Sequence, residues 1–321
     1  MEAVYGTPED IQDWMSLVRK VRDNFPGLET EEGLTDYENT VLKFIGKNQA
    51  LCVKDGGKIC GVILFSRNRN MICCLAVDPE YRRKGIASLM LDKALSELDP
   101  NREVTVSTFR EGDDKGTAPR ALYKKFGFCE GELTVEFDYP NQVFFRPAKM
   151  NIIHYYFPGT DPWKNIMNLP EEEAFAKAKE LADAHPEDPS FGRFADFANY
   201  YPTRKETDAY VHDRFVEKGG RPELLHPFSF TLLECEYLRK WFSEGEKLVL
   251  DLNDIPEDQI SFTIGDSCAQ YGWGDRPKVL TKKELLQKIH ACGGSVETFL
   301  KDSLGRFAYV EVHVWTGKES K

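Results

Sequence analysis

The stretch that decides the fold is LAVDPEYRRKGIA, residues 75–87. It begins as the end of an apolar strand, turns through a basic loop and opens an amphipathic helix. The first residues of a helix leave backbone N–H groups unpaired and carry partial positive charge, which favours bound phosphate. Gly85 and Ala87 allow phosphate oxygens to approach the main chain, and Arg82 and Arg83 add charge. The stretch therefore predicts a diphosphate-binding loop, followed by a helix with a buried stripe of Ile86, Leu89, Met90, Ala94 and Leu98.

The flanking sequence predicts one compact α/β unit with the element order ααβββαβαββ. The first helix opens at TPED, residues 7–10, and the second at Thr35, which has capping-box spacing to Glu38. We expect strands over 49–53, 59–65, 71–77, 104–109, 129–138 and 142–145, and helices over 85–98 and 119–126. A short linker, RPAK at residues 146–149, ends the unit, so we predict one domain over 1–148 and another over 150–321.

The second half restarts the alternation of strands and helices and is predicted to be an α+β domain. An aromatic-rich stretch over 191–201 precedes a helix expected over 204–218. Core packing and turns account for most of these residues. A sharper interpretation is a polar and aromatic pocket built from Arg193, Asp196, Tyr201, Arg204 and His226. No pattern in this half identifies a reaction.

Two motifs of the first half, in the same order and spacing, resemble those of one known family. The segment RRKGIA, residues 82–87, resembles the coenzyme A-binding motif of the GNAT superfamily of N-acetyltransferases. The segment RALYKKFGF, residues 120–128, resembles the helix-to-strand signature of the same superfamily. The resemblance covers about residues 1–146 and implies a GNAT-like mixed sheet flanked by helices.

The resemblance also implies roles for particular residues. The backbone of a splayed strand at Leu75, Ala76 and Val77 would pair with the pantetheine arm of acetyl-CoA, the expected co-substrate. Arg82, Arg83, Gly85, Ile86 and Ala87 would hold its diphosphate. Gly116 stands where many members have an asparagine. The neighbouring Thr117 could substitute for that asparagine.

Tyr123 matches the tyrosine that commonly protonates the departing thiolate. Free tyrosine titrates near about 10 and a thiol near about 8.5, so a protonated tyrosine can supply that proton at neutral pH. The alternative is that Tyr123 only packs. The expected buried stripe of its helix is Ala118, Leu122 and Phe126, with Tyr123 on its shoulder.

The resemblance implies direct transfer of an acetyl group from acetyl-CoA to an amine. The proton of that amine could pass to water or to Glu111, Asp113, Asp36 or Glu38. A covalent route through Cys73 or Cys74 has little support because no histidine lies nearby in the domain. The alternative function is an acyl-CoA-binding regulatory or interaction module in which the C-terminal domain carries the main activity. A further alternative makes the C-terminal half a separate enzyme.

Composition limits the partners. The chain of 321 residues has a net charge of −11, and its two halves carry 21 basic with 24 acidic residues (1–150) and 21 with 29 (151–321). This balance argues against general nucleic-acid binding and suits a small-molecule or peptide amine. Apolar runs are short and the first residues, MEAVY, contain no signal-like block, so we expect a cytoplasmic protein without membrane contact.

Eight cysteines without C-x-x-C spacing and six scattered histidines predict reduced thiols and no metal. The acceptor and the oligomeric state are left open by the sequence.

Overall fold

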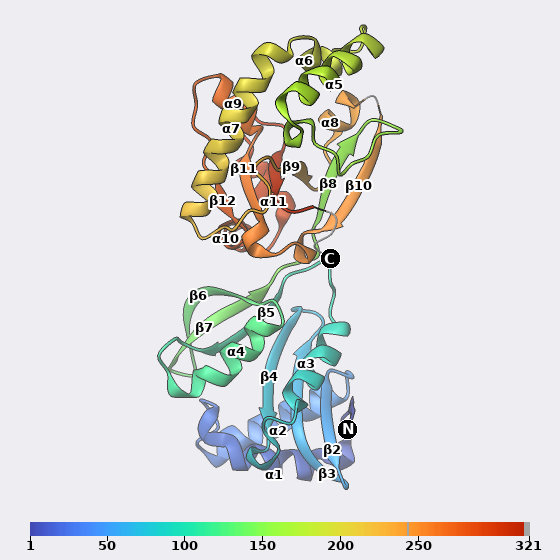
Figure 1. The fold of residues 1–321 in the computed structure, drawn as a ribbon. Coiled ribbons are helices and arrows are strands. Elements are labelled where there is room, and N and C mark those ends of the chain that lie inside the picture. The colour runs from blue at the N-terminus through green and yellow to red at the C-terminus, as the bar shows by residue number, and fades with distance from the viewer. Residues whose placement is uncertain (243, 318–321) are drawn as a thin grey trace. The chain divides into compact units, whose positions relative to one another are not determined.

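The computed structural model describes residues 1–242 and 244–317. The chain divides into two compact units, Met1–Ala148 and Lys149–Lys321, each with a sheet of its own (Figure 1). Within the described residues, no helix combines the length and apolar character needed to cross a membrane.

The N-terminal unit is built on a seven-stranded mixed sheet with the strand order β1-β2-β3-β4-β5-β7-β6. Neighbouring strands are antiparallel except β4 and β5, which are parallel. The strands are β1 (Ala3–Tyr5), β2 (Ala50–Asp55), β3 (Lys58–Ser66), β4 (Met71–Val77), β5 (Val104–Phe109), β6 (Cys129–Glu136) and β7 (Tyr139–Arg146). The helices are α1 (Ile11–Val21), α2 (Glu31–Ile45), α3 (Ile86–Ser96) and α4 (Thr117–Lys125).

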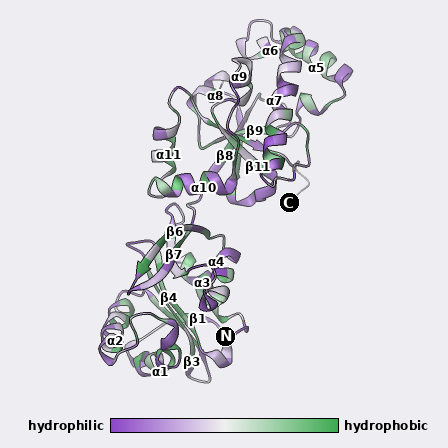
Figure 2. Ribbon diagram, turned by 90° about the vertical axis from the view of Figure 1, so that its left-hand side faces the viewer, coloured by the Kyte–Doolittle hydropathy of each residue, from purple (hydrophilic) through white to green (hydrophobic). Residues whose placement is uncertain are grey.

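Two hydrophobic cores, one on each face of the sheet, hold this unit together. Leu51 and Val53 of β2 belong to the core beneath α3, whereas Ala50 and Cys52 of the same strand belong to the core beneath α1 and α2. Because successive side chains of a strand point to opposite faces, a strand covered on both faces has an uninterrupted apolar sequence. The central strands are accordingly hydrophobic along their length (Figure 2). The mixed α/β fold with flanking helices is confirmed.

Three local predictions for this unit were wrong. Helix α2 begins at Glu31, where the Thr30 hydroxyl accepts a hydrogen bond from the Gly33 N–H, and Thr35 lies inside the helix, bonded to the Glu31 carbonyl. Strand β1 was not predicted, because three residues are too few to show an alternating pattern. In α3, Leu89 is exposed and Leu91 takes its place in the core.

The C-terminal unit is built on a six-stranded antiparallel sheet with the order β10-β8-β9-β13-β11-β12. Its strands are β8 (Asn151–Tyr156), β9 (Phe228–Leu232), β10 (Glu246–Asp251), β11 (Ile260–Ile264), β12 (Leu280–Thr281) and β13 (Val310–Val314). Its helices are α5 (Glu171–Ala184), α6 (Gly192–Ala195), α7 (Phe197–Glu217), α8 (Glu236–Trp241), α9 (Ser267–Gly272), α10 (Lys282–Ala291) and α11 (Val296–Ser303). A second α+β region is therefore confirmed. Helix α7 starts seven residues before the expected position and runs through Pro202.

Candidate functional site

Strands β4 and β5 diverge in the middle of the N-terminal sheet. The one residue pair that joins them is Met71 with Thr105, at the beginning of both strands. Beyond it, β4 stays paired with β3 as far as Val77, and β5 stays paired with β7 through Phe109. Among the described residues, the edge of β4 that faces β5 therefore has no strand partner over 75–77. Free backbone N–H and C=O groups on this edge can pair with an extended ligand, as an added strand does.

The end of β4 is fixed by a buried carboxylate. Asp78 is 1% exposed, and its carboxylate lies 3.0 Å from Lys20 Nζ and 3.5 Å from Lys58 Nζ. Its other oxygen accepts the backbone N–H of Glu80 at 3.1 Å. Burial opposes ionisation, but the hydrogen bonds from Lys20 and the Glu80 N–H, together with the charges of Lys20 and Lys58, outweigh it, and the pKa of Asp78 is below its ordinary value. The turn that leads from β4 to α3 is thus held in a defined position.

The basic loop that follows, residues 82–84, exposes its charged side chains to solvent. Arg82, Arg83 and Lys84 are exposed, and neither arginine forms an ion pair with another described residue. The ammonium group of Lys84 lies over the ring of Tyr81, 4.4 Å from its centroid. Arg83 and Gly85 have φ angles of 63° and 80°, and the glycine adopts this left-handed conformation without strain. The loop therefore presents two arginines beside the start of α3.

The start of α3 lacks a side-chain cap. Gly85 occupies the cap position, so the first N–H groups of the helix point outward without a protein acceptor at that position. The helix lies close to the sheet because Gly61 of β3 has no side chain: a Cβ there would be 2.6 Å from Ile86 Cγ2 and 2.9 Å from Met90 Cε. Residues 75–77, the arginine loop and the N-terminus of α3 are consecutive in the chain and form one continuous surface. This arrangement can bind an extended chain that ends in a diphosphate.

Tyr123 lies on the buried face of α4 and not on its shoulder, as the sequence predicted. It is 5% exposed and its ring centroid is 5.4 Å from that of Phe128 and 6.2 Å from that of Phe144. Ala118, expected in the stripe, is exposed. The Tyr123 hydroxyl has no hydrogen-bond partner among the described residues. Burial raises the pKa of Tyr123, so the hydroxyl stays protonated at neutral pH.

Gly116 cannot be replaced by a larger residue without movement of its surroundings. A Cβ at this position would be 3.1 Å from the Arg110 carbonyl oxygen and 3.1 Å from Phe109 Cβ. Thr117, the neighbouring candidate, is exposed at the first position of α4.

The opposite face of β5 carries polar groups. Val104 and Val106 point into the core beneath α3, so Ser107 and Phe109 point to the other face. There the Ser107 hydroxyl donates to Glu136 Oε1 at 2.6 Å. On the same side, Tyr139 makes an edge-on ring contact with Phe109 and donates its hydroxyl proton to Asp113 Oδ2 at 2.6 Å. Glu136 was missed from the sequence, because only the strand register brings it to Ser107.

The segment between α1 and α2 closes this face from the other side. Lys115 Nζ donates to the Asp23 carbonyl at 2.5 Å, and Phe137 packs against Gly27, where a Cβ would be 2.9 Å from its ring. The β6–β7 hairpin and the α1–α2 segment thus touch, with polar residues of β5 beside them.

The expected base candidates differ in their surroundings. Asp113 accepts hydrogen bonds from the Tyr139 hydroxyl and from the Lys115 N–H. Glu111 and Asp36 are exposed, and Glu38 is half-buried. The Cys74 thiol lies 3.4 Å from the Tyr37 hydroxyl, and burial raises its pKa to about 11. A thiol with this pKa is a weak nucleophile at neutral pH.

The pocket predicted in the second half is assembled only in part. Arg193 and Arg204 line one cavity of the C-terminal unit. Tyr201 packs against Phe197 and is not part of the cavity lining, and Asp196 is exposed. His226 is held outside the cavity lining by Asp208, whose Oδ2 is 2.7 Å from His226 Nδ1.

Comparison with known proteins identifies the first of the two units. Residues 46–130 match the family model described as acetyltransferase (GNAT) domain. The N-terminal unit contains a GNAT acetyltransferase domain. The matched residues include β4, the arginine loop, α3 and Tyr123. Acetyl transfer is the general activity that this match supports, and the GNAT-like fold expected from the sequence is confirmed for this unit.

Several solved structures are similar to the GNAT domain. An acetyltransferase of the GNAT family from Bacillus cereus is 19% identical, with 45% of this chain and 94% of that chain covered at a TM-score of 0.36. An N-acetyltransferase from Staphylococcus aureus is 18% identical, with 45% and 100% covered at 0.38. The PaiA N-acetyltransferase of Thermoplasma acidophilum, solved with coenzyme A, is 18% identical, with 45% and 97% covered at 0.35. No curated protein sequence matches the chain.

Proposed function

We propose that the GNAT domain transfers the acetyl group of acetyl-CoA directly to an amine. The observation that carries this proposal is the divergence of β4 from β5, which leads without interruption into the uncapped start of α3 and its two unpaired arginines. A linear thioester that ends in a diphosphate matches this arrangement, in which a free strand edge is followed by an anion-binding helix start.

Each part of the surface has a role in holding acetyl-CoA. The pantetheine amides pair with the free edge of β4 at Leu75, Ala76 and Val77. The diphosphate accepts hydrogen bonds from the first N–H groups of α3, at Ile86 and Ala87, while Gly85 leaves space for its oxygens. Arg82 and Arg83 supply positive charge to the diphosphate from the loop. This placement puts the thioester at the point where β4 and β5 separate.

The chemistry needs one proton donor and one proton acceptor. The amine nitrogen attacks the thioester carbonyl, the new C–N bond forms, and the C–S bond breaks. Tyr123 donates its hydroxyl proton to the leaving sulfur and is reprotonated from solvent, and the amine gives up its proton to water or a carboxylate. The products are an amide and the free thiol of coenzyme A. Because its pKa is raised, the Tyr123 hydroxyl stays protonated and can act as the donor.

The acceptor enters from the face that carries Glu136, Asp113 and Ser107. Two carboxylates on this face favour a cationic amine over a neutral alcohol or an anion, because opposite charge concentrates the substrate near the site. Glu136 is held by Ser107 at 2.6 Å, so its second oxygen remains available to orient the ammonium group. We propose Glu136 as the acceptor-binding carboxylate of this face.

Release of coenzyme A thiol from acetyl-CoA tests the proposal. The whole chain is incubated with acetyl-CoA and with separate members of an amine panel: a polyamine, free amino acids, a peptide with a free N-terminus and a lysine peptide. We expect at least one amine to raise the thiol release far above the rate without amine. Saturable acetyl-CoA binding without amine-dependent release from any member would favour the regulatory module instead.

A further inference from the structure

The C-terminal unit contains an open cavity of about 1760 Å³. Aromatic rings form much of its lining, among them Phe157, Trp163, Phe230 and Phe242. Phe157 and Phe242 contact each other with centroids 5.1 Å apart, and Trp163 and Phe230 are 6.3 Å apart. A cavity with such walls accommodates a flat or apolar body.

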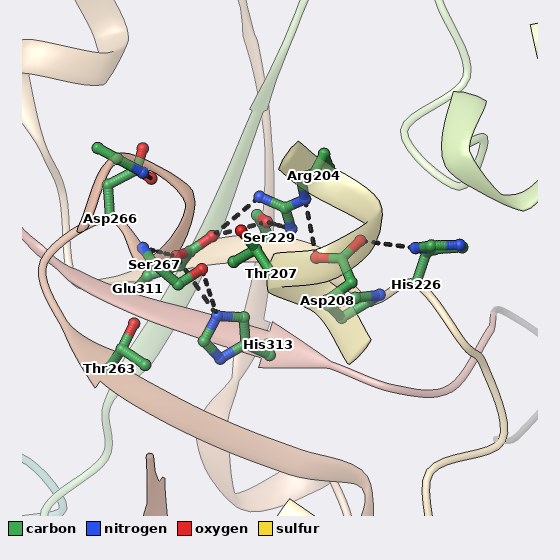
Figure 3. Close-up of polar contacts among 12 residues, drawn as sticks. Arg204, Thr207, Asp208, His226, Ser229, Thr263, Asp266, Ser267, Glu311 and His313 are labelled. Atoms are coloured by element: carbon green, nitrogen blue, oxygen red, sulfur yellow. Dashed lines mark hydrogen bonds and ion pairs between the residues drawn. The ribbon is translucent and has the colours of Figure 1, made fainter. Parts of the chain in front are cut away.

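Buried polar side chains of the C-terminal unit form a network (Figure 3), and three of its members, Arg204, Ser229 and Glu311, also line the cavity. Arg204 projects from α7, and its Nε is 2.8 Å from Asp208 Oδ1 while its Nη2 donates to Ser229 Oγ at 3.2 Å. Glu311 of β13 accepts the Ser229 hydroxyl at 2.9 Å and the Ser267 N–H at 2.7 Å. Its Oε1 is also 3.8 Å from Arg204 Nη1. The charge of Arg204 is thus balanced within the protein.

Asp266, another carboxylate of the cavity lining, has hydrogen-bond donors at both oxygens. Asp266 accepts the Ala269 N–H at 2.8 Å through Oδ1 and the Tyr309 hydroxyl at 2.9 Å through Oδ2. Both oxygens therefore have a donor, and Asp266 holds the start of α9 in place. A ligand cation would have to displace one of these contacts to reach it.

Arg193 differs from the other charged groups of the lining. Its guanidinium lies 4.5 Å from the centroid of the Phe194 ring and 5.9 Å from that of Phe242, and its Nη1 donates to the Ser190 carbonyl at 2.6 Å. The charges of Asp266 and Asp188 favour its charged form. A guanidinium has five N–H donors, so most of those of Arg193 have no protein acceptor. A half-buried arginine against aromatic rings, with N–H donors that no described residue accepts, is a site for an anion.

The carboxylates near Arg193 favour a ligand with one negative charge over a dianion. Asp266 and Glu311 line the same cavity, and Arg204 is already neutralised by Asp208 and Glu311. A dianion such as a phosphate monoester would be repelled by these carboxylates more strongly than a monoanion, although Lys164 and Lys177 also line the cavity. A carboxylate matches the fork of one guanidinium with two parallel hydrogen bonds.

We propose that this cavity binds a small organic carboxylate with an aromatic or apolar body. The carboxylate accepts hydrogen bonds from Arg193, and the body lies against the rings of Phe157 and Phe242. The site belongs wholly to the C-terminal unit and does not depend on the acetyl-transfer proposal. An experiment that refutes carboxylate binding in this cavity therefore leaves the acetyl-transfer proposal untouched, and the reverse also holds.

The test uses the fluorescent aromatic monoanion 1-anilinonaphthalene-8-sulfonate with the whole chain. We expect one bound probe per chain, and we expect Arg193→Gln to weaken its binding at least about tenfold, because a hydrogen bond to a charged group is lost. The neutral analogue N-phenyl-1-naphthylamine should bind both proteins within about threefold of each other. Arg221→Gln, an exposed arginine outside the cavity lining, is the matched control and should change neither affinity.

Competition identifies the preferred charge. Phenylacetate should displace the anionic probe at a lower concentration than phenyl phosphate, and phenethylamine should not displace it. Equal binding of the anionic probe to the wild type and Arg193→Gln, or displacement by phenethylamine as effective as by phenylacetate, would overturn the proposal. If Arg193→Gln does not fold, Arg193→Lys replaces it: the charge remains but the fork is lost, so phenylacetate should compete at least about threefold less well. Unchanged competition in that variant overturns the proposal as well.

Discussion

Replacing Tyr123 by phenylalanine removes the hydroxyl that we assign to proton donation and keeps the ring in its place. The ring packs against Phe128 and Phe144, and the hydroxyl has no hydrogen-bond partner among the described residues. The variant therefore loses no protein contact, and we expect its free energy of unfolding to stay within about 0.5 kcal/mol of the wild type. Any loss of activity can then be attributed to chemistry.

The expected loss is large. General acid catalysis contributes about 10²-fold or more to a rate, which corresponds to about 2.7 kcal/mol of activation free energy. The kcat of Tyr123→Phe should fall by this factor, while the affinity for acetyl-CoA stays nearly constant because the diphosphate is bound elsewhere. The loss should shrink with an activated thioester, whose thiolate leaves without a proton.

The pH dependence follows from the direction of the pKa shift. Burial is the main cause of the raised pKa of Tyr123, and the neighbouring Cys74 adds to it. A donor with a raised pKa stays protonated beyond the value of about 10 at which free tyrosine titrates. Wild-type activity should therefore show no decline from this group up to about pH 10.

The assay compares the release of coenzyme A thiol by the wild type, Tyr123→Phe and Tyr5→Phe. Tyr5 lies on the edge strand β1 and its hydroxyl hydrogen-bonds Glu97, so the same substitution there controls for the loss of a tyrosine hydroxyl that has a structural partner. Near-normal turnover of Tyr123→Phe with both natural and activated thioesters would refute the role of Tyr123 as an acid.

Three further substitutions test diphosphate binding at the start of α3 and the stability of the surrounding fold. Gly85→Glu should weaken acetyl-CoA binding at least about tenfold in calorimetric titration, because a carboxylate at the start of α3 repels the diphosphate; unchanged affinity removes this assignment. Asp78→Asn should lower the free energy of unfolding by about 1–3 kcal/mol in urea, since Lys20 loses its charged acceptor, and an unchanged midpoint would count against the anchoring role. Glu97, whose pKa is lowered to about 2 by hydrogen bonds from Tyr5, Arg67 and Lys93, stabilises the fold above its ordinary pKa of about 4.5. That contribution is lost as the pH falls toward 2, so Glu97→Gln should show a flatter loss of stability in this range, and identical acid-unfolding curves would contradict it.

The sequence predicted what lies close together along the chain. Strand β4, the arginine loop and α3 are consecutive, so their composition and periodicity were enough to place them. The pairing of Ser107 with Glu136 joins residues 29 apart and depends on the register of three strands. A single sequence contains no signal for that register.

The pocket predicted in the second half was correct only in part, because its residues on α7 lie on different faces of that helix. Arg204 lines the cavity together with Tyr200, four residues earlier on the same face of α7. Tyr201 is one residue further round the helix, packs against Phe197 and does not line the cavity. The start of α7 was predicted seven residues too late, so the orientation of its first two turns could not be derived.

The central claim is that residues 1–148 contain a complete acetyl-CoA site. This unit has a continuous sheet and two cores of its own, so a fragment of these residues should fold. Calorimetric titration of that fragment with acetyl-CoA measures the claim directly. The account predicts a one-to-one complex with an affinity close to that of the whole chain. A folded fragment that shows no binding at millimolar acetyl-CoA would contradict it.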